Sequence, residues 1–266
     1  MADPRCVLLD LDGVIWLADE PIPGAAEAVG QLADMGVRVA YFTNNSFPLL
    51  ATHLEKLHRF GLEPAAEDVL TSPQAAARCC TPGERALVLG GPGILEALAA
   101  RGVEAQGVSD DLAANGAGAP SADVVVCGID PNLTYQRLAI ATGALRRGAR
   151  FVATNDDATF PRPDGVVPGA GAILAALATA SGCQPVIAGK PHAPAAELAL
   201  ERLGRIDLVV GDRASTDGAL ALRLGVPFAL VLSGVTQPGH GPLEVEPAIE
   251  AADLAALAGD LGQRWR

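Results

Sequence analysis

The chain has 266 residues, of which 50% are hydrophobic, and its formal net charge at pH 7 is −12. This length is sufficient for one large domain or two modest ones. The lysines and arginines form no cluster, so the sequence lacks the positive patch typical of proteins that bind nucleic acid or anionic membranes. Its longest apolar stretch, near residues 169–180, is shorter than the ~20 residues needed to cross a bilayer. With no signal-peptide pattern, we expect a cytoplasmic protein whose partners are small molecules.

Apolar runs and helical patterns alternate along the chain, and a glycine follows most of the helical patterns. Glycine in this position is a common helix stop. Strands are predicted over residues 6–9, 37–42, 86–89, 123–127, 150–153, 207–210 and 227–232. Helices are predicted over residues 25–35, 49–59, 94–101, 133–147, 193–203 and 217–224. This alternation predicts an α/β protein with doubly wound, parallel sheets.

A set of strands with helices of its own occupies the middle of the sequence. A Thr-Pro-Gly turn begins at Thr81, and a segment rich in Pro and Gly, which we expect to be a long loop, covers residues 161–171 before an alanine-rich helix. We therefore predict an inserted α/β domain over residues 84–182. The core domain would be formed by residues 1–83 and 183–266.

Two carboxylates, Asp10 and Asp12, follow the first predicted strand, and Gly13 then allows a tight turn. Open α/β sheets bind their ligands at the carboxyl ends of the strands. One carboxylate could attack a substrate and the other exchange protons, while a divalent cation would offset their mutual repulsion. A strand end with two solvated acids is the alternative. We expect Trp16, a few residues further on, to pack beside the site.

Polar residues also follow the second predicted strand. Thr43, Asn44 and Asn45 stand between that strand and a helix, where hydroxyl and backbone N–H groups can hold an anion. Capping of the helix is the alternative function of these residues.

Lys190 and Lys56 are the two lysines of the chain, whose other cationic side chains are arginines. A compact ammonium fits a crowded phosphate site better than a planar guanidinium. Lys190 is therefore a candidate phosphate ligand, with an ordinary loop lysine as the alternative, whereas we interpret Lys56 as a solvated surface residue. Asp212 and Asp217, which follow the strand predicted at 207–210, could complete an oxygen-only site for Mg²⁺. Asp217 could also cap a helix.

Taken in order, these segments resemble the four motifs of the haloacid dehalogenase (HAD) superfamily of phosphohydrolases. They read Asp-Leu-Asp-Gly at 10–13, Thr-Asn-Asn at 43–45, Gly-Lys-Pro at 189–191 and Gly-Asp-Arg to Thr-Asp at 211–217. The segments at 155–160 and 165–171 are similar to the cap domain of NagD-like members, which have a type IIA cap. One departure lies in this cap, because the family usually has Asn-Pro-Asp where this chain has Asn155, Asp156 and Asp157.

The resemblance, which extends over residues 7 to about 235, implies a two-step phosphoryl transfer. Asp10 would be the nucleophile that forms an aspartyl-phosphate. Asp12 would protonate the leaving alcohol and then deprotonate the attacking water. Thr43 and the Asn44 amide, together with Asn45, would bind the phosphoryl oxygens.

The resemblance also implies a cation site and a substrate loop. Lys190 would neutralise the phosphate. Mg²⁺ would bind Asp10, the carbonyl of Asp12 and Asp212, and Asp217 would orient Lys190 or a water bound to the metal. Asn155, Asp156 and Asp157 would contact the substrate from the cap.

These observations predict a phosphatase of small phosphomonoesters. Asp156 and Asp157 would repel a carboxylate and accept hydrogen bonds from hydroxyls, which favours glycerol phosphate over phosphoglycolate, although Arg162 could compensate. Nucleotide monophosphates and pyridoxal phosphate remain open as substrates. A phospho-aspartate switch is disfavoured because Asp12 would hydrolyse its acyl phosphate, and a phosphomutase would need a bisphosphate activator. The chain is also compatible with a homodimer formed through the cap.

Overall fold

The computed structural model describes residues 5–110, 121–162 and 165–265. The chain forms two compact units, which are described separately below. One comprises Met1–Thr43, Ala51–Leu70 and Lys190–Arg266, and the other comprises Asn44–Leu50 and Thr71–Gly189. The chain therefore passes between the units four times, after Thr43, Leu50, Leu70 and Gly189. The domain boundaries predicted after residues 83 and 182 differ from these limits and stay a prediction.

The first unit contains a six-stranded sheet in which the first strand of the chain is central. This strand, β1 (Cys6–Leu9), pairs in parallel with β4 (Arg38–Thr43) on one side and with β13 (Leu208–Gly211) on the other. All four of its residues are buried, as expected for a strand covered on both faces. The complete order is β15 (Ile249–Ala251), β14 (Phe228–Val231), β13, β1, β4 and β5 (Val69–Thr71). Later strands of the chain lie on both sides of β1, with β4 on one side and β13 on the other. The carboxyl end of β1 is therefore a topological switch point.

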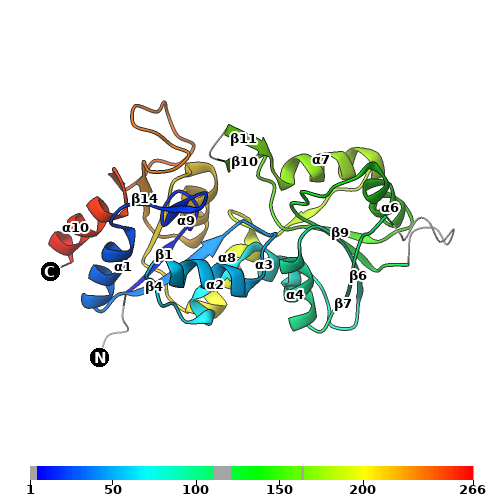
Figure 1. Cartoon of the computed structure of the whole chain (residues 1–266), viewed down its shortest axis with the longest axis horizontal. Coiled ribbons are helices and arrows are strands. Elements are labelled where there is room, and N and C mark those ends of the chain that lie inside the picture. Colours follow the sequence, from blue (N-terminus) through cyan, green and yellow to red (C-terminus); the bar gives the residue numbers. More distant parts are fainter. Residues whose placement is uncertain (1–4, 111–120, 163–164, 266) are drawn as a thin grey trace. The chain divides into compact units, whose positions relative to one another are not determined.

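The helices of the first unit bury one apolar face each. In α1 (Ala25–Asp34) the buried residues are Ala25, Ala28 and Leu32, which lie on one face at helical spacing. Figure 1 shows α1 beside α10 (Leu254–Arg264), against which it packs. The other helices are α2 (Leu50–Arg59), whose first residue belongs to the second unit, α8 (Ala193–Leu203) and α9 (Ala219–Leu224), together with a short 3₁₀ helix, Ala66–Asp68.

Two local features of this unit concern the site. The helix predicted over 217–224 starts later than expected, because Ala214–Gly218 forms a π-helical turn that contains Asp217. A small hairpin of β2 (Trp16–Leu17) and β3 (Glu20–Pro21) follows β1.

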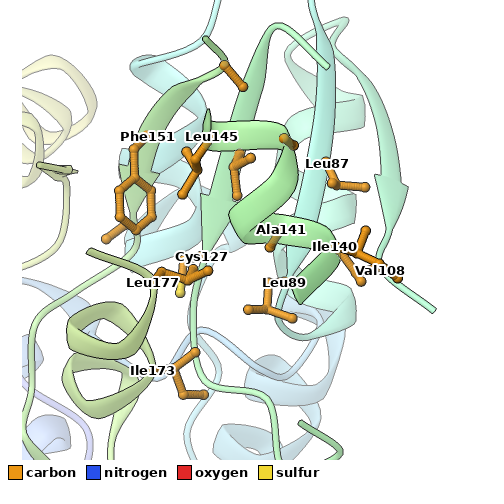
Figure 2. Close-up of a cluster of buried hydrophobic side chains, with 14 of the residues drawn as sticks. Leu87, Leu89, Val108, Cys127, Ile140, Ala141, Leu145, Phe151, Ile173 and Leu177 are labelled. Atoms are coloured by element: carbon orange, nitrogen blue, oxygen red, sulfur yellow. The ribbon is translucent and has the colours of Figure 1, made fainter. Parts of the chain in front are cut away.

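The second unit is built on a five-stranded parallel sheet of its own. Its order is β12 (Val186–Ile187), β9 (Arg150–Ala153), β8 (Val124–Cys127), β6 (Arg85–Leu89) and β7 (Glu104–Gly107). Its helices are α3 (Ser72–Arg78), α4 (Pro92–Ala100), α6 (Tyr135–Arg146) and α7 (Ala170–Ser181). Every second residue of the central strands faces one core, to which α6 and α7 contribute, as Figure 2 shows for Leu89, Cys127, Ala141 and Leu177. The prediction of an α/β fold with parallel sheets is confirmed in both units.

The prediction of a long loop over residues 161–171 is wrong in part. Residues Thr159–Arg162 (β10) and Gly165–Pro168 (β11) pair as an antiparallel hairpin, and α7 begins at Ala170. Phe160 pairs with Val167, so the β-forming side chains of the segment outweigh its prolines, which a two-stranded ribbon tolerates because both of its strands are edges. In the part of the chain that the structure describes, no helix is both long and apolar enough to cross a membrane.

Candidate active site

The carboxyl end of β1 brings three motifs together in the first unit. Leu9 pairs with Tyr41 of β4 and with Val210 of β13, and the backbone N–H of Asp10 donates to the carbonyl of Val210 over 2.8 Å. Parallel pairing in this register places Asp10, the end of β4 at Thr43 and the residue after β13, Asp212, at one edge of the sheet. The close approach of these motifs thus follows from the strand order.

Lys190 is buried between two carboxylates of this edge. Its Nζ lies 2.8 Å from Asp10 Oδ1 and 2.7 Å from Asp217 Oδ1, and the residue is only 2% exposed. Burial by itself would lower the pKa of Lys190, but the two ion pairs outweigh it and raise the pKa above its usual range. Lys190 is therefore a permanent cation of the site.

Three carboxylates surround this single cation. Oxygens of Asp10, Asp212 and Asp217 lie within 4.8 Å of one another. Burial, followed by repulsion from Asp217, raises the pKa of Asp212 to about 6. The pKa of Asp10 is also raised by burial, against the attraction of Lys190. Hard oxygen donors with an excess of negative charge fit a divalent cation such as Mg²⁺, which relieves this repulsion.

Two glycines allow the carboxylates to approach so closely. Gly13 has a φ of 84°, and a Cβ built there would overlap the carboxylate of Asp212. A Cβ at Gly211 would overlap the carboxylate of Asp217. Because both overlaps involve groups held in buried positions, these two glycines are required for the arrangement of the acids.

Asp12 makes different contacts from the other acids. Its Oδ1 accepts a hydrogen bond from Trp16 Nε1 over 2.9 Å, and the hydroxyl of Thr43 is a second partner. Burial raises the pKa of Asp12, while the bond from Trp16 and the charge of Lys56 oppose the rise. Its carboxylate is not in the cluster formed by the other three, and the role of its carbonyl as a cation ligand stays a prediction.

Two expectations about neighbouring residues have different outcomes. Trp16 packs beside the site, as predicted, and is 2% exposed. The interpretation of Lys56 as a solvated surface residue is wrong, because its side chain is only 19% exposed and its Nζ lies 4.3 Å from the centre of the Trp16 ring. A polar helical stripe cannot reveal this contact, since the aromatic partner comes from a distant hairpin.

Three of the remaining predicted residues, Asn44, Asn155 and Asp157, form a hydrogen-bonded group in the second unit. The Asn44 carbonyl accepts from Asn155 Nδ2 and from Ser72 Oγ, each over 2.8 Å, and Asn44 Nδ2 donates to Asp157 Oδ2 over 3.1 Å. Asn155 is buried, whereas Asp156 is exposed.

The Asn45 side chain serves a structural purpose in the same unit. Its Oδ1 accepts from the backbone N–H of Phe47 over 3.3 Å, which stabilises the turn that leads into α2. The contact of these residues with a phosphate stays a prediction.

The segment after β14 supports the site and was not predicted. Ser233 Oγ donates to the carbonyl of Gly13 over 2.7 Å, and the backbone N–H of Val235 donates to Asp212 Oδ2. The Ser-Gly pair that follows the predicted strand at 227–232 was the available signal, because that strand also ends at the sheet edge of the site.

Comparison with known proteins agrees with this geometry. Residues 7–104 match the family described as haloacid dehalogenase-like hydrolase, and residues 187–257 match a second HAD-hydrolase-like family. The chain is 35% identical to an acid sugar phosphatase of Staphylococcus saprophyticus over 89% of each chain. It is 34% identical to the 5'-nucleotidase YutF of Bacillus subtilis over 92% of this chain and 94% of that protein.

A solved structure shows the same similarity. The glycerol phosphate phosphatase Rv1692 from Mycobacterium tuberculosis, determined in complex with magnesium, has a TM-score of 0.83 and 33% identity to this chain, and the match covers 96% of this chain and 77% of that one. The chain therefore belongs to the haloacid dehalogenase-like hydrolases, and the resemblance seen in its four motifs is confirmed. Within that family it is a phosphatase.

The ion pairs of Lys190 lead to a first prediction. Lys190→Arg should be nearly as damaging to phosphatase activity as Lys190→Ala, because a planar guanidinium cannot occupy the narrow space between Asp10 and Asp217 with both contacts intact. Both variants should also lower the melting temperature, since each disturbs the balance of charge among buried acids. Initial rates and thermal melts are the measurements. Arg59→Lys is the matched control, because it makes the reverse exchange of the two cationic side chains at an exposed position. Retention of most activity by Lys190→Arg would contradict the prediction.

The pKa of Asp212 leads to a second prediction, for the protein without added metal. A carboxyl whose pKa is raised on folding favours the folded state below its unfolded pKa, and this contribution is lost as the pH rises through the folded value, about 6. Mg²⁺ competes with protons for the carboxylates, so it should raise the melting temperature more at about pH 7.5 than at about pH 5. Thermal melts with Mg²⁺ and with EDTA test this, and Asp212→Asn should reduce the difference between the two pH values. An equal Mg²⁺ effect at both would contradict it.

Proposed function

We propose that this phosphatase hydrolyses small phosphomonoesters through an aspartyl-phosphate formed on Asp10, with Mg²⁺ as cofactor and glycerol phosphate as the preferred substrate. The observation that carries the proposal is the position of Asp10 at the switch point, with Lys190 Nζ 2.8 Å from its Oδ1. The backbone N–H of Leu11 also donates to Oδ1, over 2.8 Å. Both contacts fall on the same oxygen, so Oδ2 is the atom suited to attack phosphorus.

The other residues of the first unit fit the two steps of such a reaction. Attack by Asp10 breaks the bond between phosphorus and the ester oxygen, and that oxygen takes a proton from Asp12. Asp12, now ionised, then takes a proton from the water that hydrolyses the acyl phosphate. Lys190 neutralises charge on the phosphoryl group, and the Thr43 hydroxyl is a hydrogen-bond donor for it. Asp10, Asp212 and the Asp12 carbonyl would hold Mg²⁺, which supplies further neutralisation of the phosphate oxygens when bound.

A phospho-aspartate switch is a poorer explanation of this site. A switch must preserve its acyl phosphate, whereas a general base two residues from the nucleophile promotes its hydrolysis. Asp12 has such a position, and its pKa is raised by burial, which suits a group that must both donate and accept a proton.

The choice of glycerol phosphate depends on the second unit and on the similar proteins. Those proteins are named for a sugar phosphate, a nucleotide and glycerol phosphate, so they agree on small phosphate substrates rather than on one compound. Asp156 is exposed, and its charge disfavours substrates with a carboxylate such as phosphoglycolate. Asp157 is less exposed than Asp156 and accepts a hydrogen bond from Asn44, so the greater exposure of Asp156 makes it the stronger candidate for direct substrate selection. A homodimer through the cap and a cytoplasmic location stay predictions from the sequence.

The proposed reaction predicts different losses at the two acids of the first motif. Asp10→Asn should abolish turnover, because an amide is neither a comparable nucleophile nor an anionic ligand. Asp12→Asn should lose roughly 10²–10⁴-fold, the usual contribution of general acid–base catalysis. Initial rates on p-nitrophenyl phosphate and on glycerol phosphate, with Mg²⁺ and after chelation, are the measurements. Near-normal turnover by either variant, or full activity of the wild type without a divalent cation, would refute the assigned roles.

The proposed substrate choice predicts a shift in specificity. Asp156→Asn removes a negative charge but retains an acceptor oxygen, so kcat/KM for phosphoglycolate should rise relative to that for glycerol phosphate. Asp157→Asn is the matched control and should change this ratio less, since Asp157 is already bonded to Asn44. Activity on p-nitrophenyl phosphate should change little in Asp156→Asn. An unchanged ratio would remove the electrostatic argument for a polyol phosphate.

A further inference from the structure

Trp16 contacts the proposed acid–base residue but has no place in the phosphate chemistry described above. Trp16 is 2% exposed, and its Nε1 donates to Asp12 Oδ1 over 2.9 Å. Its backbone also connects to the loop that carries Asp12, because the N–H of Gly13 donates to the Trp16 carbonyl over 2.7 Å. Both the indole and the backbone of Trp16 thus hold the segment between Asp12 and the β2–β3 hairpin.

Lys56 of α2 holds Trp16 and its hairpin in turn. Its Nζ lies 4.3 Å from the centre of the indole ring, a cation–π distance, and donates to the carbonyl of Ala18 over 2.5 Å. Ala18 stands between β2 and β3 and has a φ of 52°, a left-handed conformation that is unfavourable for alanine. The contact with Lys56 therefore stabilises a hairpin turn that the sequence itself does not favour.

The indole differs from other hydrogen-bond partners of a carboxyl group in one respect. An indole N–H can only donate, so the oxygen that it contacts must be an acceptor whether Asp12 is ionised or protonated. A hydroxyl such as that of Thr43 can donate or accept and imposes no such restriction. The O–H oxygen of a protonated carboxyl is a poorer acceptor than its C=O oxygen, so the bond from Trp16 to Oδ1 favours the form in which Oδ2 carries the proton.

We infer that Trp16 and Lys56 are positioning residues that fix the Asp12 carboxyl group, so that its Oδ2 delivers the proton to the leaving group. The inference rests on the proposed function, because it presumes that Asp12 is the general acid. Lys56 acts on Asp12 through its contact with Trp16 and also through its charge, and neither side chain is assigned a contact with the substrate. Trp16 and Lys56 should therefore affect one step, the protonation of the leaving group. Their effect on the rate should be largest for a leaving group that needs a proton and smallest for one that departs readily as an anion.

The first experiment compares two leaving groups in Trp16→Phe, which keeps an aromatic ring but removes the N–H. The parameter is kcat/KM, which reports the steps up to phosphoryl transfer. It should fall on the order of tenfold more for glycerol phosphate, an alkyl ester, than for p-nitrophenyl phosphate, whose leaving group is a stable anion. Lys56→Met should produce a smaller change in the same direction. Equal losses on the two substrates would overturn the inference, since a general loss of folded protein lowers both alike.

Arg59→Met is the matched control for Lys56→Met. Arg59 lies on the same helix and places its guanidinium 5.2 Å from the centre of the Phe60 ring. The Phe60 ring lies 6.0 Å from that of Trp16, so Arg59 reaches the indole only through Phe60. Its removal deletes a cation–π contact of the same kind and should leave the ratio of the two kcat/KM values unchanged. A change as large as that of Lys56→Met would overturn the role of Lys56.

The second experiment does not depend on activity. Trp16 and Trp265 are the two tryptophans of the chain, so Trp265→Phe leaves Trp16 as the single indole fluorophore. In that background Lys56→Met and Asp12→Asn should each change the emission of Trp16, whereas Arg59→Met should not. If the emission of Trp16 is unchanged in Lys56→Met, the contact between Lys56 and the indole is refuted. This outcome can be read even if the Trp16→Phe variant does not fold. A wild type without phosphatase activity would refute the proposed function, whereas an active wild type whose variants lose both substrates equally would refute this inference alone.

Discussion

The buried ion pairs of Lys190 with Asp10 and Asp217 are the interaction on which the site depends. Removing charges from water is costly, and the cost is recovered only if each charge is closely paired. Here three carboxylates face one ammonium, so the ionised site has an excess of two negative charges. A phosphate dianion would be repelled by that excess. A divalent cation cancels it, which is why we regard cation binding as the condition for phosphate binding in this site and Lys190 as insufficient on its own.

The strand order explains why these charges meet at all. Asp10, Thr43 and Asp212 belong to distant parts of the sequence, but β1 lies between β4 and β13 in a parallel sheet, and the three strands end at the same edge. Asp217 reaches that edge through the π-helical turn after β13, which replaces the first turn of the expected helix. The absence of a side chain at Gly13 and Gly211 then allows the carboxylates their close approach.

The sequence predicted what depends on local pattern and on order along the chain. The alternation of apolar runs predicted the central strands, with β1 and β9 at the observed residues. It could not predict contacts whose partners are distant in sequence. Lys56 has the pattern of a solvated helical residue, and only the folded hairpin brings Trp16 beneath its ammonium. Likewise, Ser233 is an ordinary loop residue until the sheet places it beside the carbonyl of Gly13.

The departure from the usual Asn-Pro-Asp sequence in the second unit can now be interpreted in terms of contacts. Asn155 and Asp157, the two positions that agree with the family, both bond to Asn44, one through its carbonyl and the other through its side-chain amide. Asp156, the position that differs, is exposed. The two contacts with Asn44 therefore involve only the positions that agree with the family. The departure adds a charge at the surface of the loop, so its consequence is expected in the choice of substrate rather than in the structure of the loop.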